Sequence, residues 1–384
     1  MPGTSFGTFI GTPFIRGQTW WPFMRSFTEW TTKCCAFLER GLPVVDVLRY
    51  LGDELDHKPD ELEYFPDGFK NDYLNADVLF NRLDVKDGRF VLPDGMSYAA
   101  IWVPDSVLVL PETRTRLDAL AAKGGRVVYG TADASVAGLK PQVVANPSLL
   151  WYHRVDGDTD CFFAAADEKG FSGKATFRTR HGDKTLSLNL APFENRLLEF
   201  SADVAPSVPS VAFVPSISLN SWTLSFPKGW GAPEKMKLDR LVPWKDLPGV
   251  SEEGRSFSGT ATYTTTVSLA AKPEGALQLD LGDVRDFARV FVNGREAAIL
   301  WAQPYRCDIA PFVREGENEI KVKVTSTWFN RLAYDFGQPP EKRKTWTIWR
   351  IDERTPPCLK PKATLRPSGL LGPVCLRREG SPSR

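Results

Sequence analysis

Residues 287–324, FARVFVNGREAAILWAQPYRCDIAPFVREGENEIKVKV, combine alternating apolar and polar side chains with strong turn signals. Glu319 to Val324 alternate as half-buried strands do, and residues 276–281 show the same pattern. Arg289 to Val292 are interpreted as a strand that leads into a turn. The pair Asn293-Gly294 predicts a hairpin, and Gly316-Glu317-Asn318 predicts a second turn. Many short strands separated by such turns are typical of antiparallel sandwiches and jelly rolls. We therefore expect a β-sandwich over residues 216–384.

Upstream of this region, residues 43–141 alternate strand and helix patterns. Residues 43–50, 99–103 and 126–129 have the composition of buried strands. Residues 111–123 predict a helix with Leu117, Leu120 and Ala121 on its apolar face, ended by Gly124-Gly125. This order predicts a parallel, flavodoxin-like sheet, whose ligands would bind beyond the carboxyl ends of the strands. Neither a GxGxxG motif nor a P-loop follows a strand, so a nucleotide site is not supported.

The first 42 residues cannot close a core of their own. Residues 5–10 predict a short strand, and residues 22–39 predict an amphipathic helix that Gly41 and Pro43 end. One strand and one helix must pack on partners elsewhere. Residues 142–215 are expected to form a β-rich linking subdomain, and the proline-containing stretch 206–215 predicts its boundary.

Composition limits the classes of partner. The 384 residues include 48 Lys plus Arg and 47 Asp plus Glu, which gives a formal net charge of +1. Without a basic excess we expect no nucleic-acid partner. No apolar run reaches the roughly 20 residues that cross a bilayer, so we expect no membrane partner. The six cysteines lack zinc-site spacing. Cys34 and Cys35 are interpreted as small core residues of the helix. No signal-peptide pattern opens the chain, and the compartment stays open.

Several motifs resemble, in the same order, the bacterial α-L-rhamnosidases of glycoside hydrolase family 106. GTPFIRGQTWW (11–21) resembles the segment after the last strand of that family's catalytic barrel. The motifs that resemble its α/β domain are LPVVDVLRYLGDE (42–54), PDGFKNDYLNADVL (66–79) and LPDGMSYAAIWVP (92–104). Those that resemble its β segment, galactose-binding-like jelly roll and terminal strand are LLWYHRVDGDTDCFFAA (149–165), residues 287–332 and PSGLLGPVCL (367–376). The jelly-roll motif is the less specific, because related sandwiches occur in other glycosidases.

The resemblance implies a multidomain protein, α/β plus all-β. Residues 1–42 would be the last βα unit of a TIM-like barrel, 43–141 a flavodoxin-like α/β domain, 142–215 the linking subdomain and 216–384 a galactose-binding-like β-sandwich. A (β/α)8 barrel needs about 250 residues, and about forty precede the α/β domain here. We therefore expect the C-terminal part of a longer enzyme, from a truncated gene or a split protein whose upstream barrel half would be a partner.

The same resemblance implies an inverting glycosidase that hydrolyses the O-glycosyl bonds of rhamnose-containing glycans. Inversion needs one carboxyl group to protonate the leaving oxygen and a second, roughly 6.5–9.5 Å away, to activate water. The family uses a Glu pair on barrel strands with a calcium ion at the sugar, and we expect that pair upstream of this chain. No catalytic residue is therefore assigned, the calcium ligands stay unknown, and the chain alone is expected to be inactive. The alternative function is a non-catalytic carbohydrate-binding or accessory protein.

Six residues are candidates for substrate binding: Arg16, Thr19, Trp20, Trp21, Asp72 and Asn75. A loop after a barrel strand lies on the catalytic face, where indole rings can stack on sugars and Arg16 or Gln18 can bind hydroxyls. The alternative is that the tryptophans pack between domains. Asp72 and Asn75 belong to a polar loop with Asp67, Asn71 and Tyr73; they would contact sugar or support calcium, or else form an N-cap and turn network.

Other polar clusters favour structural roles. Glu29 is interpreted as a solvated helix charge. The acidic run around His57 (Asp53, Glu54, Asp56, Asp60, Glu61, Glu63) lacks the EF-hand order and is interpreted as a solvated face. The segment with His153, Asp156, Asp158 and Asp160 is interpreted as a hairpin that turns at Asp156-Gly157, in preference to a metal cluster. Six residues of the sandwich region are interpreted as packing residues, and a sugar-binding surface is the less favoured alternative: Trp301, Tyr305, Arg306, Trp328, Asn330 and Arg331.

Overall fold

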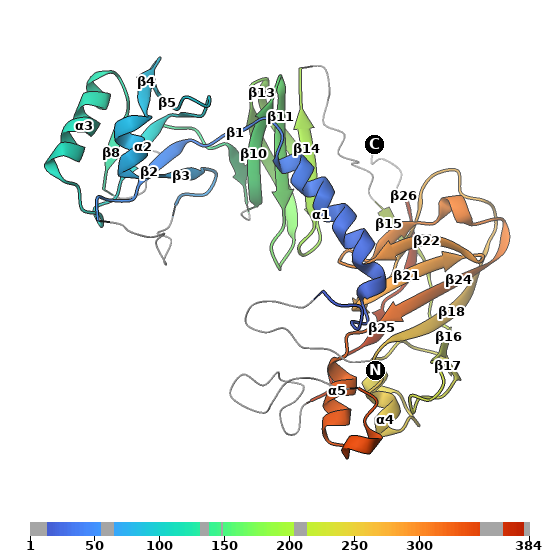
Figure 1. Cartoon of the computed structure of the whole chain (residues 1–384). Helices are drawn as coiled ribbons and strands as arrows, with labels where there is room; N and C mark the ends of the chain where they lie inside the picture. Colours follow the sequence, from blue (N-terminus) through green and yellow to red (C-terminus); the bar gives the residue numbers. More distant parts are fainter. Residues whose placement is uncertain are drawn as a thin grey trace. The chain divides into compact units, whose positions relative to one another are not determined.

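The computed structural model describes residues 14–54, 65–130, 138–146, 149–202, 213–345 and 364–379. The chain divides into two compact units, one of residues 1–31 with 211–384 and one of residues 32–210 (Figure 1). Each unit is described by itself. The strand expected at residues 5–10 lies outside the described residues, and the bounds of the four predicted segments stay predictions.

The first unit contains an antiparallel sheet of six strands and a second sheet of four. The six, in spatial order, are β17 (Lys235–Leu238), β16 (Trp222–Ser225), β18 (Thr260–Leu269), β24 (Gly316–Thr325), β21 (Phe287–Val292) and β22 (Arg295–Leu300). The four are β15 (Phe213–Ser218), β26 (Cys375–Glu379), β19 (Leu277–Asp280) and β23 (Arg306–Asp308). Both sheets contribute side chains to one core, including Trp222, Tyr263 and Leu279. The expected β-sandwich is confirmed.

Short elements complete this unit. They are the strand pair β20 (Asp283–Arg285) and β25 (Gly369–Gly372), the helices α4 (Glu252–Arg255) and α5 (Phe329–Phe336), and the 3-10 turns η2 (Trp244–Asp246), η3 (Ala310–Phe312) and η4 (Pro340–Lys342). The predicted hairpin joins β21 to β22, with φ of 50° at Asn293 and 79° at Gly294. Two positive φ angles in succession are the conformation that makes Asn-Gly the preferred hairpin pair.

The turn predicted at residues 316–318 is displaced. These residues open strand β24, and the turn lies just before them. Asn318 is fully buried, and its Nδ2 donates to the carbonyl oxygens of Arg314 (2.7 Å) and Gly316 (2.9 Å). Its Oδ1 accepts from the backbone N–H of Arg314 at 2.9 Å. The prediction was wrong for Asn318 itself because an asparagine can close a turn from the neighbouring strand through its side chain.

The second unit contains a parallel sheet ordered β3 (Asn71–Leu74), β2 (Val47–Tyr50), β7 (Ala100–Val103) and β8 (Val127–Tyr129). Counted along the chain this is 2-1-3-4, the order with which flavodoxin-like sheets begin. Its helices are α2 (Ala76–Asn81) and α3 (Pro111–Ala122), and a small antiparallel sheet consists of β4 (Asp84–Lys86), β5 (Arg89–Val91) and β6 (Ser97–Tyr98). The parallel α/β arrangement is confirmed.

Two details of this region were predicted wrongly. The strand expected at residues 43–50 is split: β1 (Leu42–Pro43) pairs antiparallel with β10, and only β2 joins the parallel sheet. The interruption falls at Asp46, whose backbone and side chain bond to other segments. On α3, Ala121 is exposed and Thr113 is buried instead, because residues 113, 117 and 120 share the face toward the sheet.

Two further antiparallel sheets complete this unit and share one core around Phe162, Phe177 and Phe200. The first is ordered β1, β10 (Leu150–Asp156), β11 (Thr159–Ala165) and β14 (Asn195–Phe200). The second is ordered β13 (Gly182–Leu190), β12 (Phe171–Thr179) and β9 (Val143–Ala145). The β-rich character expected after residue 142 is confirmed. The chain is therefore multidomain and mostly β.

The predicted N-terminal helix consists of η1 (Trp21–Phe23) and α1 (Met24–Leu38). Phe23, Cys34 and Phe37 are buried on it. Cys35 is exposed, against expectation, because it lies about 100° around the helix from Cys34. The helix ends before Gly41, which adopts φ +52°. That this segment ends a TIM-like barrel is not confirmed.

Candidate functional site

Hydrogen bonds to backbone atoms fix the segment that contains the candidate residues Arg16, Thr19, Trp20 and Trp21. The indole Nε1 of Trp328 donates to the carbonyl oxygen of Gly17 at 2.7 Å. Within the loop, the N–H of Gln18 donates to Ile15 O at 3.1 Å and the N–H of Trp21 to Gln18 O at 3.2 Å. These bonds fix consecutive turns that lead directly into η1.

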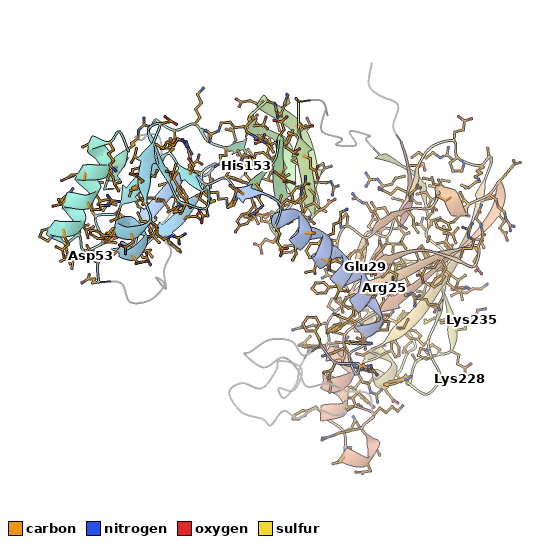
Figure 2. All side chains as sticks on the ribbon, turned by 45° about the horizontal axis from the view of Figure 1, so that its top comes forward. Arg25, Glu29, Asp53, His153, Lys228 and Lys235 are labelled. Atoms are coloured by element: carbon orange, nitrogen blue, oxygen red, sulfur yellow. The ribbon has the colours of Figure 1, made fainter. Side chains whose placement is uncertain are left out.

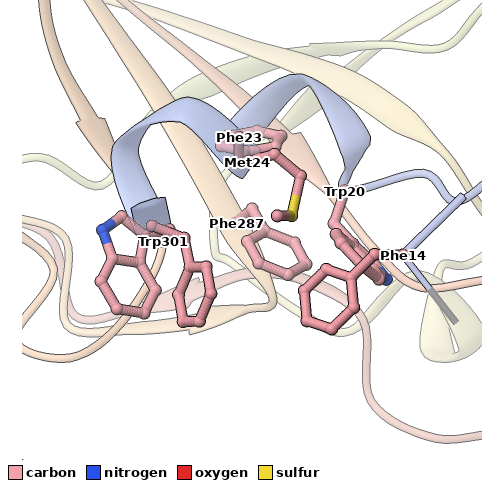
Figure 3. Close-up of a pocket in the computed structure, with 7 residues that line it drawn as sticks. Phe14, Trp20, Phe23, Met24, Phe287 and Trp301 are labelled. Atoms are coloured by element: carbon pink, nitrogen blue, oxygen red, sulfur yellow. The ribbon is translucent and has the colours of Figure 1, made fainter. Parts of the chain in front are cut away.

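An aromatic cavity lies beside this loop (Figure 3). Its volume is about 160 Å³, and it is lined by Phe14, Trp20, Phe23, Met24, Phe27, Phe287 and Trp301. Trp20 meets Phe14 edge-on at 5.5 Å between ring centroids, and Phe23 lies 5.1 Å from Phe287. Trp20 is thus the candidate residue that the structure brings into the cavity. In the same loop Arg16 is exposed and Thr19 is partly buried, and Trp21, which begins η1, is partly buried as well.

The interaction that this cavity can offer a ligand is stacking on aromatic rings. Its walls are almost entirely carbon, so they offer a planar or apolar face to a ligand and leave hydroxyl groups to be bound by other residues. The rings also pack on one another: Trp301 makes edge contacts with Phe27 at 5.4 Å and with Trp30 at 5.3 Å. Part of the aromatic content is therefore core, as the packing interpretation predicts.

Asp72 and Asn75 belong to regular structure. Asp72 lies on β3, where the polar loop was expected, and its Oδ2 accepts from the Tyr98 hydroxyl at 3.0 Å. Asn75 is the N-cap of α2, and its Oδ1 accepts from the backbone N–H of Val78 at 2.9 Å. The loop prediction was wrong, because residues 71–74 pair with β2. The N-cap interpretation of Asn75 is confirmed.

Asp53 occupies the place where an open α/β sheet usually receives a ligand (Figure 2). The strand order reverses between β2 and β7, and α3 begins beside that point. Asp53 accepts hydrogen bonds there from the Tyr50 hydroxyl (2.7 Å), the N–H of Leu110 (2.8 Å) and the Thr113 hydroxyl (2.7 Å). A carboxylate of the chain itself therefore meets the positive end of the helix. The solvated role predicted for Asp53 is wrong; Glu54 is exposed, and residues 56–63 of the acidic run lie outside the described part of the chain.

The hairpin predicted at Asp156-Gly157 is confirmed, since β10 and β11 pair from Asp156 with Thr159. Two members of this segment point inward. His153 and Asp160 are buried and bond to each other, Nε2 to Oδ1, at 2.9 Å. His153 follows the alternation of β10, between exposed Tyr152 and half-buried Arg154, which is typical of a residue that faces a core. Asp160 gives no such signal, because the next residues, Cys161 and Phe162, are buried as well.

Packing contacts account for the six aromatic and polar residues of the sandwich. The guanidinium of Arg331, which is fully buried, lies 2.8 Å from Asp335 Oδ1 and 3.1 Å from Glu253 Oε1. Hydrogen bonds from Lys344 and Arg331 bring the pKa of Glu253 below its ordinary value, against the effect of burial. Asn330 bonds to residues 366 and 368, the Tyr305 hydroxyl donates to Asp286 O at 2.7 Å, and Arg306 pairs with Asp280. These contacts support the packing interpretation over a sugar-binding surface.

Among the residues that the structure describes, no three His, Cys, Asp or Glu side chains gather as metal ligands would. Calcium stays an implication of the family resemblance, and its ligands in this chain stay unassigned. In the same part of the chain, no helix is both long and apolar enough to cross a bilayer.

Comparison with known proteins agrees with this architecture. Residues 1–141 match the family described as α-L-rhamnosidase, glycoside hydrolase family 106, and residues 255–354 match the galactose-binding-like domain of glycosyl hydrolase family 2. The structure of a rhamnosidase from Novosphingobium sp. PP1Y is similar at 25% identity with a TM-score of 0.80, over 96% of this chain and 42% of that one. A Formosa agariphila protein provisionally named a β-glucuronidase is 35% identical over 202 residues, 47% of this chain and 17% of that protein.

A Ruminococcus gnavus β-glucuronidase structure is 22% identical over 29% of this chain and 20% of that chain, with a TM-score of 0.26. The chain thus spans less than half the length of each of these relatives. By both sequence and fold it is related to the α-L-rhamnosidases of glycoside hydrolase family 106.

Proposed function

We propose that this chain is the α/β and β-sandwich part of a glycoside hydrolase of the α-L-rhamnosidase type, which acts on rhamnose-containing glycans. The observation that carries the proposal is the likeness to the Novosphingobium rhamnosidase, at a TM-score of 0.80 over 96% of the chain. The match of residues 1–141 to the rhamnosidase family supports the same sugar. The Formosa relative supports the broader class, hydrolysis of O-glycosyl bonds.

Within such an enzyme we assign this chain to substrate binding and support, and not to acid–base chemistry. Glu29, in the segment that would end the barrel, is 62% exposed at its side chain and bonds to Arg25 at 2.7 Å. A catalytic acid needs a raised pKa and a sheltered position facing the leaving oxygen, and this glutamate has no such shelter. Calcium stays an implication of the resemblance, and no step is assigned to it here.

The proposed sugar contacts are Arg16, Thr19, Trp20 and Trp21 in one unit and Asp72 and Asn75 in the other. Support for Trp20 is its place in the wall of the aromatic cavity, where one face of a ring could stack on it. Support for Arg16 is its exposed guanidinium four residues away. Asp72 and Asn75 already hold Tyr98 and the start of α2, so a sugar hydroxyl would have to share those oxygens.

The test measures turnover and binding separately. The purified chain is incubated with an aryl α-L-rhamnoside and, in parallel, an aryl β-D-glucuronide, each with calcium or with a chelator. Binding of methyl α-L-rhamnoside is followed by ligand-observed NMR for the wild type, Trp20→Ala and the control Phe193→Ala, whose ring is exposed. We expect no turnover, and rhamnoside binding that Trp20→Ala weakens about tenfold while the control leaves it unchanged.

Each other outcome refutes a stated part. Turnover of the rhamnoside would keep the enzyme class and overturn the assignment to binding. Turnover of the glucuronide, or failure to bind the rhamnoside, would refute the assignment of rhamnose as the sugar that is recognised. Equal weakening by both variants would remove Trp20 from the site.

A further inference from the structure

A chain of four buried polar side chains crosses the unit formed by residues 32–210. It runs from Asp46, ahead of β2, through Gln142, ahead of β9, to His153 on β10 and Asp160 on β11 (Figure 2 labels His153). Gln142 Nε2 lies 2.6 Å from Asp46 Oδ2, His153 Nδ1 lies 2.8 Å from Gln142 Oε1, and His153 Nε2 lies 2.9 Å from Asp160 Oδ1. All four side chains belong to residues at most 7% exposed. They join the segment that enters the parallel sheet to the two neighbouring β-sheets.

The orientation of the Gln142 amide is fixed by what surrounds it. Its Nε2 faces two acceptors, Asp46 Oδ2 and, at 3.3 Å, the carbonyl oxygen of Val44. A carbonyl cannot donate a proton, so the NH2 group belongs on this side and Oε1 faces His153. The Nδ1 atom of His153 must then carry a hydrogen.

The second ring nitrogen of His153, Nε2, must also carry a hydrogen. Asp160 Oδ2 accepts from the backbone N–H of Arg180 at 3.1 Å, and Oδ1 faces His153 Nε2. Burial would raise the pKa of Asp160, but the hydrogen bonds from His153 and Arg180 hold that pKa below its ordinary value. Asp160 is therefore an ionised acceptor, and Nε2 must carry a hydrogen as well. A neutral imidazole has one N–H group, and this position requires two.

If the Gln142 amide is flipped, with its oxygen and nitrogen exchanged, the four side chains still lack one hydrogen. Nδ1 would then accept from the amide, but Oε1 would meet Asp46, whose Oδ1 is paired with Arg178 Nη2 at 3.0 Å. The missing hydrogen would then be needed between Gln142 Oε1 and Asp46 instead of at His153. We propose that this chain of side chains holds one additional proton, resident on His153, and that it forms a pH-sensitive joint between the parallel sheet and the neighbouring β-sheets.

The charges around the ring set the direction of the response. Burial, helped by the charge of Arg178 on β12, brings the pKa of His153 below its ordinary value, although Asp160 on β11 and Asp46 ahead of β2 favour the charged ring. The second proton is therefore held in mild acid and lost as the pH rises. The ring also stacks on Phe162 at 3.9 Å between centroids. With the proton present, three links are complete; when the proton leaves at higher pH, two acceptors face each other in a buried site, which is unfavourable. The joint is therefore closed in mild acid and loosened in base.

Two measurements on the full chain test this inference. The ¹⁵N shifts of the His153 ring, assigned by their loss in His153→Gln, should show both nitrogens protonated at pH 5.5 and one deprotonated at pH 8.5. Amide exchange at Val44, which donates to His153 O, and at Gln142, which donates to Gly68 O, should speed up over the same range. After correction for base catalysis we expect about tenfold faster exchange, with no change for the amides of β18 and β24.

Asp160→Asn separates a proton-dependent joint from an ordinary ion pair. The amide group that this change introduces can donate to a neutral ring through its NH2 while its oxygen accepts from Arg180, so all three links close without the extra proton. We expect this variant to lose the pH dependence of exchange, while Asp158→Asn, at an exposed side chain, retains it. A wild-type ring with one N–H throughout pH 5.5–8.5, or unchanged pH dependence in Asp160→Asn, would overturn the proposal.

Discussion

Replacing Asp53 by alanine should loosen helix α3 from the parallel sheet. The carboxylate receives three hydrogen bonds, from the Tyr50 hydroxyl, the Thr113 hydroxyl and the backbone N–H of Leu110. Tyr50 and Thr113 are fully buried, so neither hydroxyl can turn to water when the carboxylate is removed. Leu110 is the N-cap residue of α3 and has no side-chain cap of its own.

The magnitude follows from these bonds. Loss of a capping acceptor costs about 0.5–2 kcal/mol, and a buried hydroxyl left without its partner costs about 1–3 kcal/mol. Because the terms are not additive, we expect about 3 kcal/mol for Asp53→Ala. Asp53→Asn keeps one acceptor oxygen and should lose about half of that. Asp118→Asn, an exposed change on the same helix, should cost less than about 0.5 kcal/mol.

Hydrogen exchange of peptides over residues 111–122 gives the opening free energy of α3 in each variant. The effect also has a pH signature. Burial raises the pKa of Asp53, but the hydrogen bonds from Leu110, Thr113 and Tyr50 outweigh it and bring the pKa below its ordinary value. A carboxylate of this kind contributes stability above its unfolded-state pKa of about 4 and loses it as the pH falls through the lower folded-state value.

The wild type and Asp53→Ala should therefore differ fully at pH 7 and converge in acid below about pH 4. Equal exchange of α3 in both proteins at pH 7 would refute the reasoning. So would a difference that persists unchanged in acid, because it would show that the charge of Asp53 plays no part.

Two further predictions concern buried polar atoms and thiols. Tyr263→Phe should destabilise the sandwich by about 1–3 kcal/mol in chemical unfolding, because the hydroxyl accepts from Trp244 Nε1 at 2.7 Å and from the N–H of Leu370 at 3.2 Å. In thiol labelling at pH 8 followed by peptide mapping, exposed Cys35 should react well before Cys307, since burial raises the pKa of Cys307 to about 12 and the thiolate is the reactive form.

Controls for these two predictions lie on the surface. Tyr152→Phe removes a hydroxyl from a residue that is 62% exposed and should leave unfolding unchanged. Under denaturing conditions both cysteines should label at comparable rates. A stable Tyr263→Phe protein, or faster labelling of Cys307 than of Cys35 in the folded protein, would contradict the structure.

The features that the sequence predicts correctly are periodic or local. Alternation along residues 319–324 predicts one buried face, and Asn293-Gly294 supplies the two positive φ angles that its hairpin needs. The helix at 111–122 follows from its length and the glycines after it. Where a segment bonds to distant partners, the local pattern fails, as at Asp46, which splits an expected strand.

The candidate site divides in the same way. Aromatic residues in GTPFIRGQTWW indicate a stacking surface, and Trp20 does line a cavity, but its walls come from residues as distant as Phe287 and Trp301. The expectation for the acidic run failed at Asp53 because its partner Thr113 lies 60 residues further on. Nothing in the residues adjacent to Asp53 indicates that a helix will begin beside it.

By itself, the sequence determined the classes of structure: a parallel α/β region, a β-sandwich and the family that both resemble. These depend on side-chain period and on turn residues, which act over a few neighbouring positions. Tertiary structure alone decided which polar groups face one another. Gln142 meets Asp46 across 96 residues, and whether His153 must hold a second proton depends on the amide that this contact orients. A proton count of that kind is a property of assembled neighbours in a buried site, where every donor needs an acceptor, and no single segment contains it.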